Sequence, residues 1–478
     1  MVPNVLYILP EVIVLSATLL IITVELFLEE EKKRYLAYVA IASLWLAALA
    51  SAPLIGVKAS LLGNMFVVDS FGIVLKVIIL IAGSMAIFLS IDFLNFPRSK
   101  QGEYYSLVLF SILGMMIMAS SINLIAIFLG IQLASIPIYI LVGFQRFDVK
   151  SNEAALKYFL LGILTAAATL YGMSLIYGLT GTLHLAEIAE RLTHINLNDP
   201  VLFMGMTFIV AGFTFKIAAV PFHFWAPDTY EGAPTPVTAF IAAVPKVAGF
   251  AALTRLVFTA FPEFTPQWIG LFGIAATLTM FTGNILAIPQ RNIKRMLAFS
   301  GIAHVGYALI ALAVTNEHAL SALIIYLIAY AAMNLGAFAV VIAVARVSPE
   351  HLIEDYAGLS RRAPLMAGAM TIFLLSMVGF PTTAGFIAKF LVFSAAVERG
   401  FIWLAIIGVL NSVISLYYYF GVVRQMYMEP PRSETPVRPT WAIGAVMVVA
   451  LLVVMVLGLF FEPFIELARS ITLINVKF

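Results

Sequence analysis

The sequence predicts an all-α, polytopic membrane protein, and three observations support that fold class. Of the 478 residues, 62% are hydrophobic and only 11% are charged, whereas soluble domains carry about 25% charged residues. The mean hydropathy is +1.04. Apolar runs of about 20 residues, the length that spans a bilayer, recur along the whole chain.

Fourteen runs are predicted to span the membrane. They cover roughly residues 5–27, 34–55, 71–93, 104–121, 122–143, 154–179, 201–224, 237–258, 266–288, 293–314, 318–346, 364–397, 401–427 and 440–461. The segment 182–194 is too polar to span. Because its apolar residues recur at helical spacing, we expect a short amphipathic helix at the membrane interface.

The lysines and arginines of the loops predict the orientation, since cytoplasmic loops carry an excess of them. With the N-terminus placed outside, sixteen of the 27 fall on the inner side, six, including Arg255, on the outer side, and five inside spans. This bias predicts that both termini lie on the outer side.

A break interrupts the seventh span in the stretch GFTFKIAAVPFHFWAPDTYEGAPTP, residues 212–236. Lys216 lies in the apolar run, and Pro221 follows five residues later. A proline inside a helix removes a backbone donor and clashes with the preceding turn. Irregular backbone at membrane depth survives where protein buries it or water lines it, and such breaks mark ion or substrate paths.

A second break is predicted at Pro381, 160 residues further on, in GFPTTAGFIAKF. Two inverted five-helix repeats, each containing one broken helix, would account for this offset, and inverted repeats are a recurrent transporter plan. The predicted division is an N-terminal three-helix segment at 1–103, a first half at 104–258, a second half at 259–427 and a C-terminal helix at 428–478.

Five lysines fall inside predicted spans: Lys76, Lys157, Lys216, Lys246 and Lys389. A charged lysine at the bilayer centre costs about 2.5–3.5 kcal/mol on insertion scales, so these side chains are expected to face protein or water. Burial disfavours the charged form, and a row of such lysines joined by water and hydroxyls is a plausible proton path. Lys216, Lys246 and Lys389 flank the breaks and are assigned to it. Lys76 is expected to snorkel to the interface, and Lys157 stays open between snorkelling and function.

Other polar residues inside the spans suit relay or pairing. His304, in AFSGIAHVGY, is a candidate for proton relay because histidine titrates near neutral pH. Glu11 and Glu25 are buried acids expected to pair with other spans or with a partner. Asp228 and Glu231 are expected to brace the first break, since two carboxylates are few for a metal site.

Several site classes are excluded by composition. The chain has no cysteine, so it holds no disulfide and no thiolate-bound iron–sulfur cluster. No glycine-rich nucleotide motif follows a strand. We expect no metal or cofactor site on the chain and no nucleic-acid partner.

Five motifs resemble one family closely. They are NEAALKYFLLG (152–162), FKIAAVPFHFWAPDTYEGAPTP (215–236), PKVAGF (245–250), NIKRMLAFSGIAHVGY (292–307) and GFIAKF (385–390). They are similar to the subunit N family of bacterial respiratory complex I, the proton-pumping NADH:quinone oxidoreductase. The resemblance implies fourteen helices with two inverted five-helix units and a place in the prokaryotic inner membrane. It also implies partners among sister antiporter-like and small hydrophobic subunits, with NADH, FMN, iron–sulfur clusters and quinone bound by other subunits.

The resemblance also implies roles for individual residues. Lys216 matches the central pumping lysine of the family. Lys246 and His304 match the residues that connect its polar axis, and Lys389 matches the terminal lysine of the second unit. At the inner side, family lysines are matched by Lys157 and Lys294.

One position departs from the family pattern. A glutamate in the fifth span usually pairs with the central lysine, and the matching stretch here, LGIQLASIPIY, has Gln132. Glutamine carries no charge that could bias the lysine. Glu153 is the nearest acid on the flanking helices, and it is expected to act on Lys216 through water at most. The alternatives are an Mrp-type cation/proton antiporter subunit and a non-pumping structural subunit.

Overall fold

The structure is a computed structural model that describes residues 6–93, 100–196 and 199–471. Within these ranges, 13 helices are long and apolar enough to cross a membrane. Two shorter helices, α15 and α16, occupy the predicted broken span at 364–397. Thirteen spans and this broken one make the fourteen predicted crossings, so the all-α, multi-pass fold class is confirmed.

The helix bounds follow the predicted spans closely. Up to the first break the helices are α1 Leu9–Glu25, α2 Leu36–Ser51, α3 Ser70–Ser90, α4 Gln101–Ser120, α5 Leu124–Val142, α6 Val149–Thr180, α7 Leu185–Leu192 and α8 Pro200–Ile217. Those that follow are α9 Trp225–Gly232, α10 Thr235–Ala260, α11 Thr265–Ala287, α12 Ile293–Val314, α13 Glu317–Ala345, α14 Leu359–Arg362, α15 Pro364–Val378, α16 Ala384–Glu398, α17 Ile402–Met428, α18 Trp441–Leu459 and α19 Glu462–Arg469.

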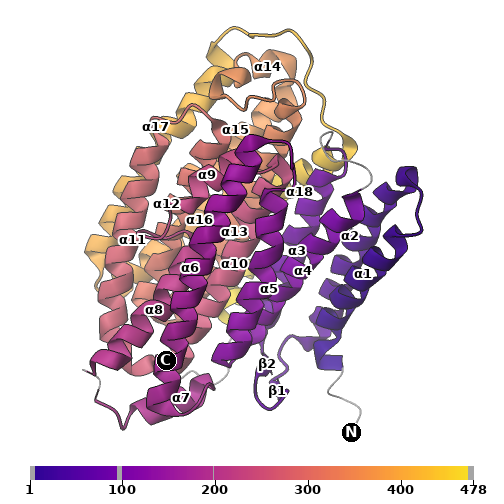
Figure 1. Cartoon of the computed structure of the whole chain (residues 1–478). Helices are drawn as coiled ribbons and strands as arrows, with labels where there is room; N and C mark the ends of the chain where they lie inside the picture. The colour runs from indigo at the N-terminus through magenta and orange to yellow at the C-terminus, as the bar shows by residue number, and fades with distance from the viewer. Residues whose placement is uncertain (1–5, 94–99, 197–198, 472–478) are drawn as a thin grey trace.

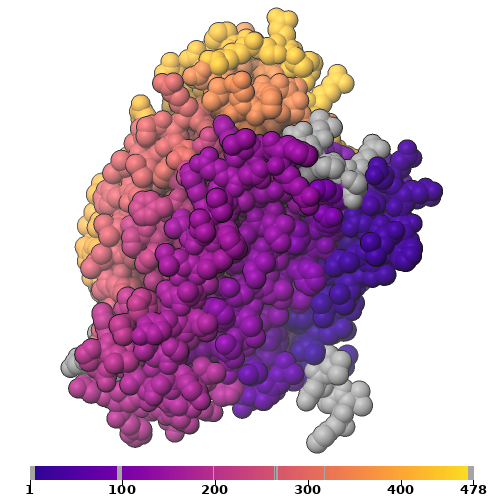
Figure 2. All heavy atoms as spheres, viewed as in Figure 1, coloured from indigo at the N-terminus to yellow at the C-terminus, as the bar shows by residue number. Residues whose placement is uncertain are grey.

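The long helices run side by side in one bundle, with α7 and a β-hairpin at one end and α14 at the other (Figure 1). The hairpin pairs β1 Ala59–Leu61 antiparallel with β2 Phe66–Val68. The helices α10, α12 and α13 are buried along almost their whole length and form the centre. The N-terminal helices lie along one flank, as Figure 2 shows. As expected, 182–194 forms a short amphipathic helix, α7, whose Leu185, Ile188 and Leu192 are buried.

The first break is present where the prolines predict it. Helix α8 ends at Ile217, and Ala218 takes a left-handed conformation with φ +61°. The Ala219 amide donates to the carbonyl of Thr214 at 2.8 Å, which closes the helix end. After the break, the Trp225 indole donates to the carbonyl of Phe215 at 2.9 Å and ties α9 back to α8. This geometry leaves Lys216 in the last turn of α8.

The second break is also present. Helix α15 ends at Val378, and Gly379 follows with φ +96°, a conformation that glycine adopts without steric cost. Helix α16 then begins at Ala384. The inverted-repeat relation between the two broken helices, and the division of the chain at 103, 258 and 427, stay predictions.

The structure overturns the expectation for Lys76. Its side chain is fully buried, and its Nζ lies 2.6 Å from Oε1 of Glu11 on α1. The lysine therefore pairs inside the bundle and does not snorkel. The expectation that Glu11 and Glu25 pair with other spans is confirmed. Glu11 pairs with Lys76 of α3, and Glu25 accepts a hydrogen bond from the amide of Gly102 in α4 at 2.9 Å.

The prediction for Arg255 is also wrong, because this residue was counted among the positive charges of the outer side. It lies inside α10 with no exposed side-chain surface and binds Asp69 through two hydrogen bonds of 2.8 Å. Asp69 also caps α3 by accepting from the amide of Gly72 at 2.8 Å. The pair joins the N-terminal helices to the centre of the bundle. The outer side therefore loses one of its six positive charges.

We expect Asp69→Ala to destabilise the protein strongly. Removing one partner of a buried ion pair leaves the other charge uncompensated, at a cost of about 3–5 kcal/mol. The thermal denaturation midpoint of the purified protein measures this loss. A double variant, Asp69→Asn with Arg255→Met, is the control. If it is as unstable as Asp69→Ala, the uncompensated charge is not the cause.

Candidate functional site

Lys216 lies at the first break and contacts hydroxyls of α5. Its Nζ donates to Ser135 Oγ at 2.8 Å and to Tyr139 OH at 3.2 Å. The ammonium also lies 5.6 Å from the centre of the Tyr139 ring and 5.4 Å from that of Phe215. Among the ion pairs of the described residues, none joins Lys216 to a carboxylate. Neutral groups therefore surround this lysine.

Gln132 and Glu153 do not replace the missing carboxylate by direct contact. Gln132 stands three and seven residues before Ser135 and Tyr139 on α5, a spacing that puts all three on one helix face. The described hydrogen bonds of Lys216 nevertheless go to the two hydroxyls. Glu153 pairs with Lys157 at 2.8 Å, at the end of α6 that carries Lys150.

Lys246 is buried in α10 and reaches toward α12 and α13. Its Nζ donates to the carbonyl of Gly301 at 3.0 Å and to Tyr330 OH at 2.7 Å. Tyr330 OH in turn donates to the carbonyl of Ala242 at 3.0 Å. Gly249, one turn further along α10, allows α8 to approach closely, because a Cβ there would lie 2.7 Å from Ile217. The break helix and the helix of Lys246 are thus in direct contact.

Gly301 is a positioning residue for Lys246. A Cβ at this position would lie 2.7 Å from Lys246 Nζ and 3.0 Å from Tyr330 OH. We therefore expect Gly301→Ala to displace the ammonium and to reduce proton transfer while the protein still assembles. Proton uptake by reconstituted vesicles measures the loss. Gly444→Ala is the matched control, because no atom lies within 4 Å of a Cβ there. Equal transfer in both variants would contradict the positioning role.

His304 is buried between two tyrosines, one from α13 and one from α17. Its Nδ1 lies 2.7 Å from Tyr326 OH, and its Nε2 lies 3.5 Å from Tyr419 OH. A cavity of about 10 Å³ is lined by His304, Lys246, Tyr326 and Tyr330, among others. This volume is about the size needed to hold one water molecule. Lys246 and His304 therefore line the same small cavity, together with apolar side chains such as Phe250 and Leu327.

Lys389 stands one turn and a half into α16 and closes the second break. Its Nζ donates to the carbonyls of Met377 at 3.0 Å and Val378 at 2.9 Å, and to Ser412 Oγ at 3.0 Å. The ammonium lies 4.3 Å from the centre of the Tyr307 ring. The two carbonyls end α15, and the C-terminal end of a helix dipole favours a positive charge. The end of α15 at the second break therefore provides two of the hydrogen-bond acceptors of Lys389.

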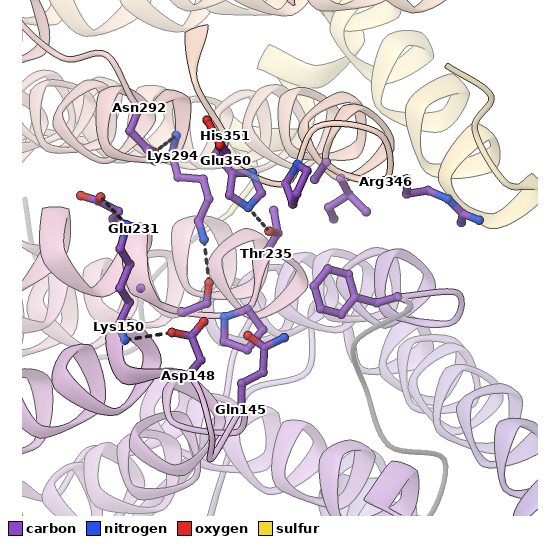
Figure 3. Close-up of a pocket in the computed structure, with 17 residues that line it drawn as sticks. Gln145, Asp148, Lys150, Glu231, Thr235, Asn292, Lys294, Arg346, Glu350 and His351 are labelled. Carbon is purple, nitrogen blue, oxygen red and sulfur yellow. Dashed lines mark hydrogen bonds and ion pairs between the residues drawn. The ribbon is translucent and has the colours of Figure 1, made fainter. Parts of the chain in front are cut away.

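A polar vestibule opens at the end of the bundle that carries Arg146 and Lys150. Its volume is about 410 Å³, and its lining includes Asp148, Glu231, Lys294 and His351. In Figure 3 the Lys294 side chain crosses the vestibule toward the chain between α9 and α10. Its Nζ donates to the carbonyl of Ala233 at 2.7 Å. The vestibule therefore leads from the surface to a buried lysine at the start of α12.

His351 forms part of the vestibule wall. Its Nε2 lies 3.4 Å from Thr235 Oγ1, and its backbone carbonyl accepts from the amide of Ile293 at 2.8 Å. Burial, and after it the nearby positive charges of Lys294 and Lys150, lower the pKa of His351 to about 3. The imidazole is therefore neutral at physiological pH and acts here as a hydrogen-bonding group.

A second cavity of about 200 Å³ lies beside the vestibule and contains a charged cluster. Lys157 pairs there with Asp228 at 2.9 Å, and Arg295 pairs with Asp228 at 2.7 Å and with Glu231 at 3.1 Å. The Lys157 side chain is 47% exposed, so it lies at the surface and not with the buried lysines Lys246 and Lys389. The expectation that Asp228 and Glu231 brace the first break agrees with these contacts.

Sequence reasoning missed the hydroxyl groups that hold the buried lysines and histidine. Tyr326 and Tyr330 lie on one face of α13, because they are four residues apart. One contacts His304 and the other Lys246. Their spacing could have signalled a shared face, but aromatic residues inside a span are ordinarily packing residues. Only the fold shows which of the 18 tyrosines face the polar groups.

The chain is similar to known proteins over most of its length. A family model described as NADH:quinone oxidoreductase/Mrp antiporter, TM, matches residues 121–415. NADH-quinone oxidoreductase subunit N of Trichlorobacter lovleyi is 46% identical over 429 residues, which cover 89% of this chain and 88% of that protein. A chain of respiratory complex I from Thermus thermophilus is 32% identical, with a TM-score of 0.82, and the match covers 97% of this chain and 100% of that one.

A chain of the Mrp complex from Dietzia sp. shares the fold, with a TM-score of 0.86 at 20% identity over 98% of this chain and 96% of that chain. This likeness concerns the fold alone. The identities above 30% across nearly complete chains decide between the two groups, and the chain belongs to the family of NADH-quinone oxidoreductase subunit N.

Proposed function

We propose that this chain moves protons across the membrane as an antiporter-like subunit of an NADH-quinone oxidoreductase. The observation that carries the proposal is the row Lys216, Lys246, His304 and Lys389, which lies between the two helix breaks at the centre of the bundle. The last three side chains are buried, and Lys216 is half-buried. Hydroxyls and backbone carbonyls surround all four groups. A lysine in such a setting can release and regain a proton at modest cost.

Protons enter this row from the vestibule in our proposal. The vestibule is polar, holds Lys294 at its inner wall and lies at the bundle end that the positive charges assign to the cytoplasm. Lys157 and Glu153 lie in the neighbouring cavity, and their role would be to shape the charge at the entrance. Both termini would then lie on the outer face of a prokaryotic inner membrane.

The redox chemistry is proposed to take place on other subunits, which would bind NADH, FMN, iron–sulfur clusters and quinone. The chain itself has no cysteine to ligate a cluster. Its partners in this proposal are the sister antiporter-like subunits and small hydrophobic subunits of the same membrane arm. The translocase role therefore belongs to this chain only within the assembled complex.

Co-purification tests the assignment. With an affinity tag on this chain, we expect hydrophobic sister subunits and a redox arm to be recovered together with NADH oxidation coupled to quinone reduction. Recovery with antiporter subunits alone, and proton flux that depends on sodium, would instead support an Mrp-type antiporter. Recovery of a redox complex whose pumping does not depend on Lys216 would support a non-pumping structural subunit.

Gln132→Glu tests whether the absent carboxylate matters to Lys216. A carboxylate on the same face of α5 would favour the charged form of the lysine. We expect the pH profile of NADH-driven proton pumping to shift to higher pH. Gln290→Glu, at a half-buried inner position, provides a control for the added charge. An unchanged profile in the Gln132 variant would show that position 132 does not influence the lysine.

A further inference from the structure

A line of polar side chains, joined by hydrogen bonds and ring contacts, connects His304 to Lys389, and one member of the line is an amide. The line runs from α12 through α17 to α11, returns to α12 at Tyr307 and reaches Lys389 of α16 by way of Ser412 of α17. In order, its members are His304, Tyr419, Tyr418, Asn284, Tyr307, Ser412 and Lys389. Hydrogen bonds join His304 to Tyr419, Tyr418 to Asn284, Asn284 to Tyr307, and Lys389 to Ser412. The rings of Tyr418 and Tyr419 are in contact, with centres 4.3 Å apart, and Lys389 Nζ lies 4.3 Å from the centre of the Tyr307 ring. All the links but Asn284 are hydroxyls, an imidazole or an amine.

Asn284 is fully buried in α11 and holds the centre of the line. Tyr418 OH donates to its Oδ1 at 3.0 Å. On the other side, its Nδ2 donates to Tyr307 OH at 3.3 Å. The tyrosine on the His304 side and the tyrosine on the Lys389 side thus meet different atoms of the same amide.

The chemistry of an amide differs from that of a hydroxyl. A hydroxyl oxygen accepts one proton and gives up another, so a chain of hydroxyls can pass a proton along. An amide accepts at oxygen and donates at nitrogen. To pass a proton it would have to gain a proton on oxygen and lose one from nitrogen, which forms the unstable imidic acid. This holds for either orientation of the amide, so the line is blocked at Asn284.

Asn411 of α17 holds the amide in place. Asn284 Nδ2 donates to Oδ1 and to the carbonyl of Asn411, both at 3.1 Å. The Asn411 side chain is itself fixed, because its Nδ2 donates to the carbonyl of Ile407 at 3.0 Å. Asn284 cannot turn out of the line without breaking several buried hydrogen bonds, each with a net worth of about 1 kcal/mol.

We propose that Asn284 is a proton-insulating link. It prevents protons bound near His304 from passing along the line to Lys389. The inference rests on the proposed function of the chain. A proton passes to Lys389 only when the amide leaves the line or water enters beside it, and both require a change of conformation. Such a link prevents protons from leaking back across the membrane between turnovers, while His304 and Lys389 stay in position for transfer.

The test uses the whole complex in proteoliposomes. A potassium diffusion potential is imposed without NADH, and proton influx is followed with an internal pH dye. Asn284→Asp places a group in the line that accepts and releases a proton, so we expect passive proton conductance to rise several-fold and pumped protons per NADH to fall. Asn284→Ser, which supplies a hydroxyl, is expected to change both in the same direction and serves if the aspartate variant does not assemble.

Two matched controls separate relay from damage. Asn284→Leu fills the position with an apolar group of similar size, and Asn411→Asp puts the same acid one contact off the line. We expect the passive proton conductance of both control variants to equal that of the wild type. Equal leak in either control, or no leak in the two Asn284 relay variants, would overturn the inference.

The same vesicles distinguish this inference from the proposed function. Lys216→Ala and Lys389→Ala are assayed for NADH-driven pumping beside the Asn284 variants. If the lysine variants lose pumping while the passive proton conductance of Asn284→Asp and Asn284→Ser stays at the wild-type level, only the proposal that Asn284 insulates the line is wrong. If the lysine variants pump as the wild type does, the proposed function itself fails.

Discussion

Lys216→Ala is expected to abolish most of the proton pumping of the assembled complex. The lysine is the titratable group of the first break, and Ser135 and Tyr139, the hydroxyls that hold it, cannot take its place as proton acceptors at neutral pH. Alanine leaves those hydroxyls free to bind water, so the fold should tolerate the change. Pumping is measured as NADH-driven acidification of proteoliposomes, with NADH oxidation recorded in parallel.

Lys32→Ala is the control for loss of a lysine, because that side chain is 60% exposed and pairs only with Glu29 among the described ion pairs. We expect it to pump as the wild type does. Pumping at the wild-type level in Lys216→Ala would show that the first break has no central role in transfer.

Lys389→Arg is expected to be as harmful as Lys389→Ala. The arginine retains a positive charge beside the carbonyls of Met377 and Val378 at the end of α15. It does not lose its proton under any condition a protein meets. If Lys389 must release a proton, the permanently charged arginine stops the transfer just as the loss of the lysine in the alanine variant does. The measurement is again the ratio of protons pumped to NADH oxidised.

The alanine variant supplies the comparison for this test. Full pumping in Lys389→Arg, together with loss in Lys389→Ala, would leave the lysine only a static role as a helix-end cation. The denaturation midpoints of both complexes must match that of the wild type, because Lys389 is buried and arginine is larger.

The sequence by itself determined the fold class, the spans and the two breaks. These features depend on local chemistry, because a bilayer demands an apolar run of fixed length and a proline interrupts a helix wherever it stands. For this reason the bounds of α10 and α12 agree with the predicted spans to within a few residues, and α8 ends at Ile217, inside the stretch where the break was predicted. The positions of Lys216 and Lys389 relative to the breaks were predictable in the same way.

The tertiary structure alone decided which polar groups meet. Lys76 was expected at the interface because only its distance from a helix end was visible, whereas Glu11, 65 residues away in the chain, pairs with it inside the bundle. Arg255 was counted among the charges of the outer side for the same reason, although Asp69 pairs with it inside the bundle.

The surroundings of the row of lysines and His304 depended on the fold in the same manner. Hydroxyl side chains of α13 and α17 reach Lys246, His304 and Lys389 only after the helices have packed. Helical periodicity gives each of these residues a face but does not say which neighbour that face meets. A hydrogen-bond line between distant helices is therefore a property of their packing.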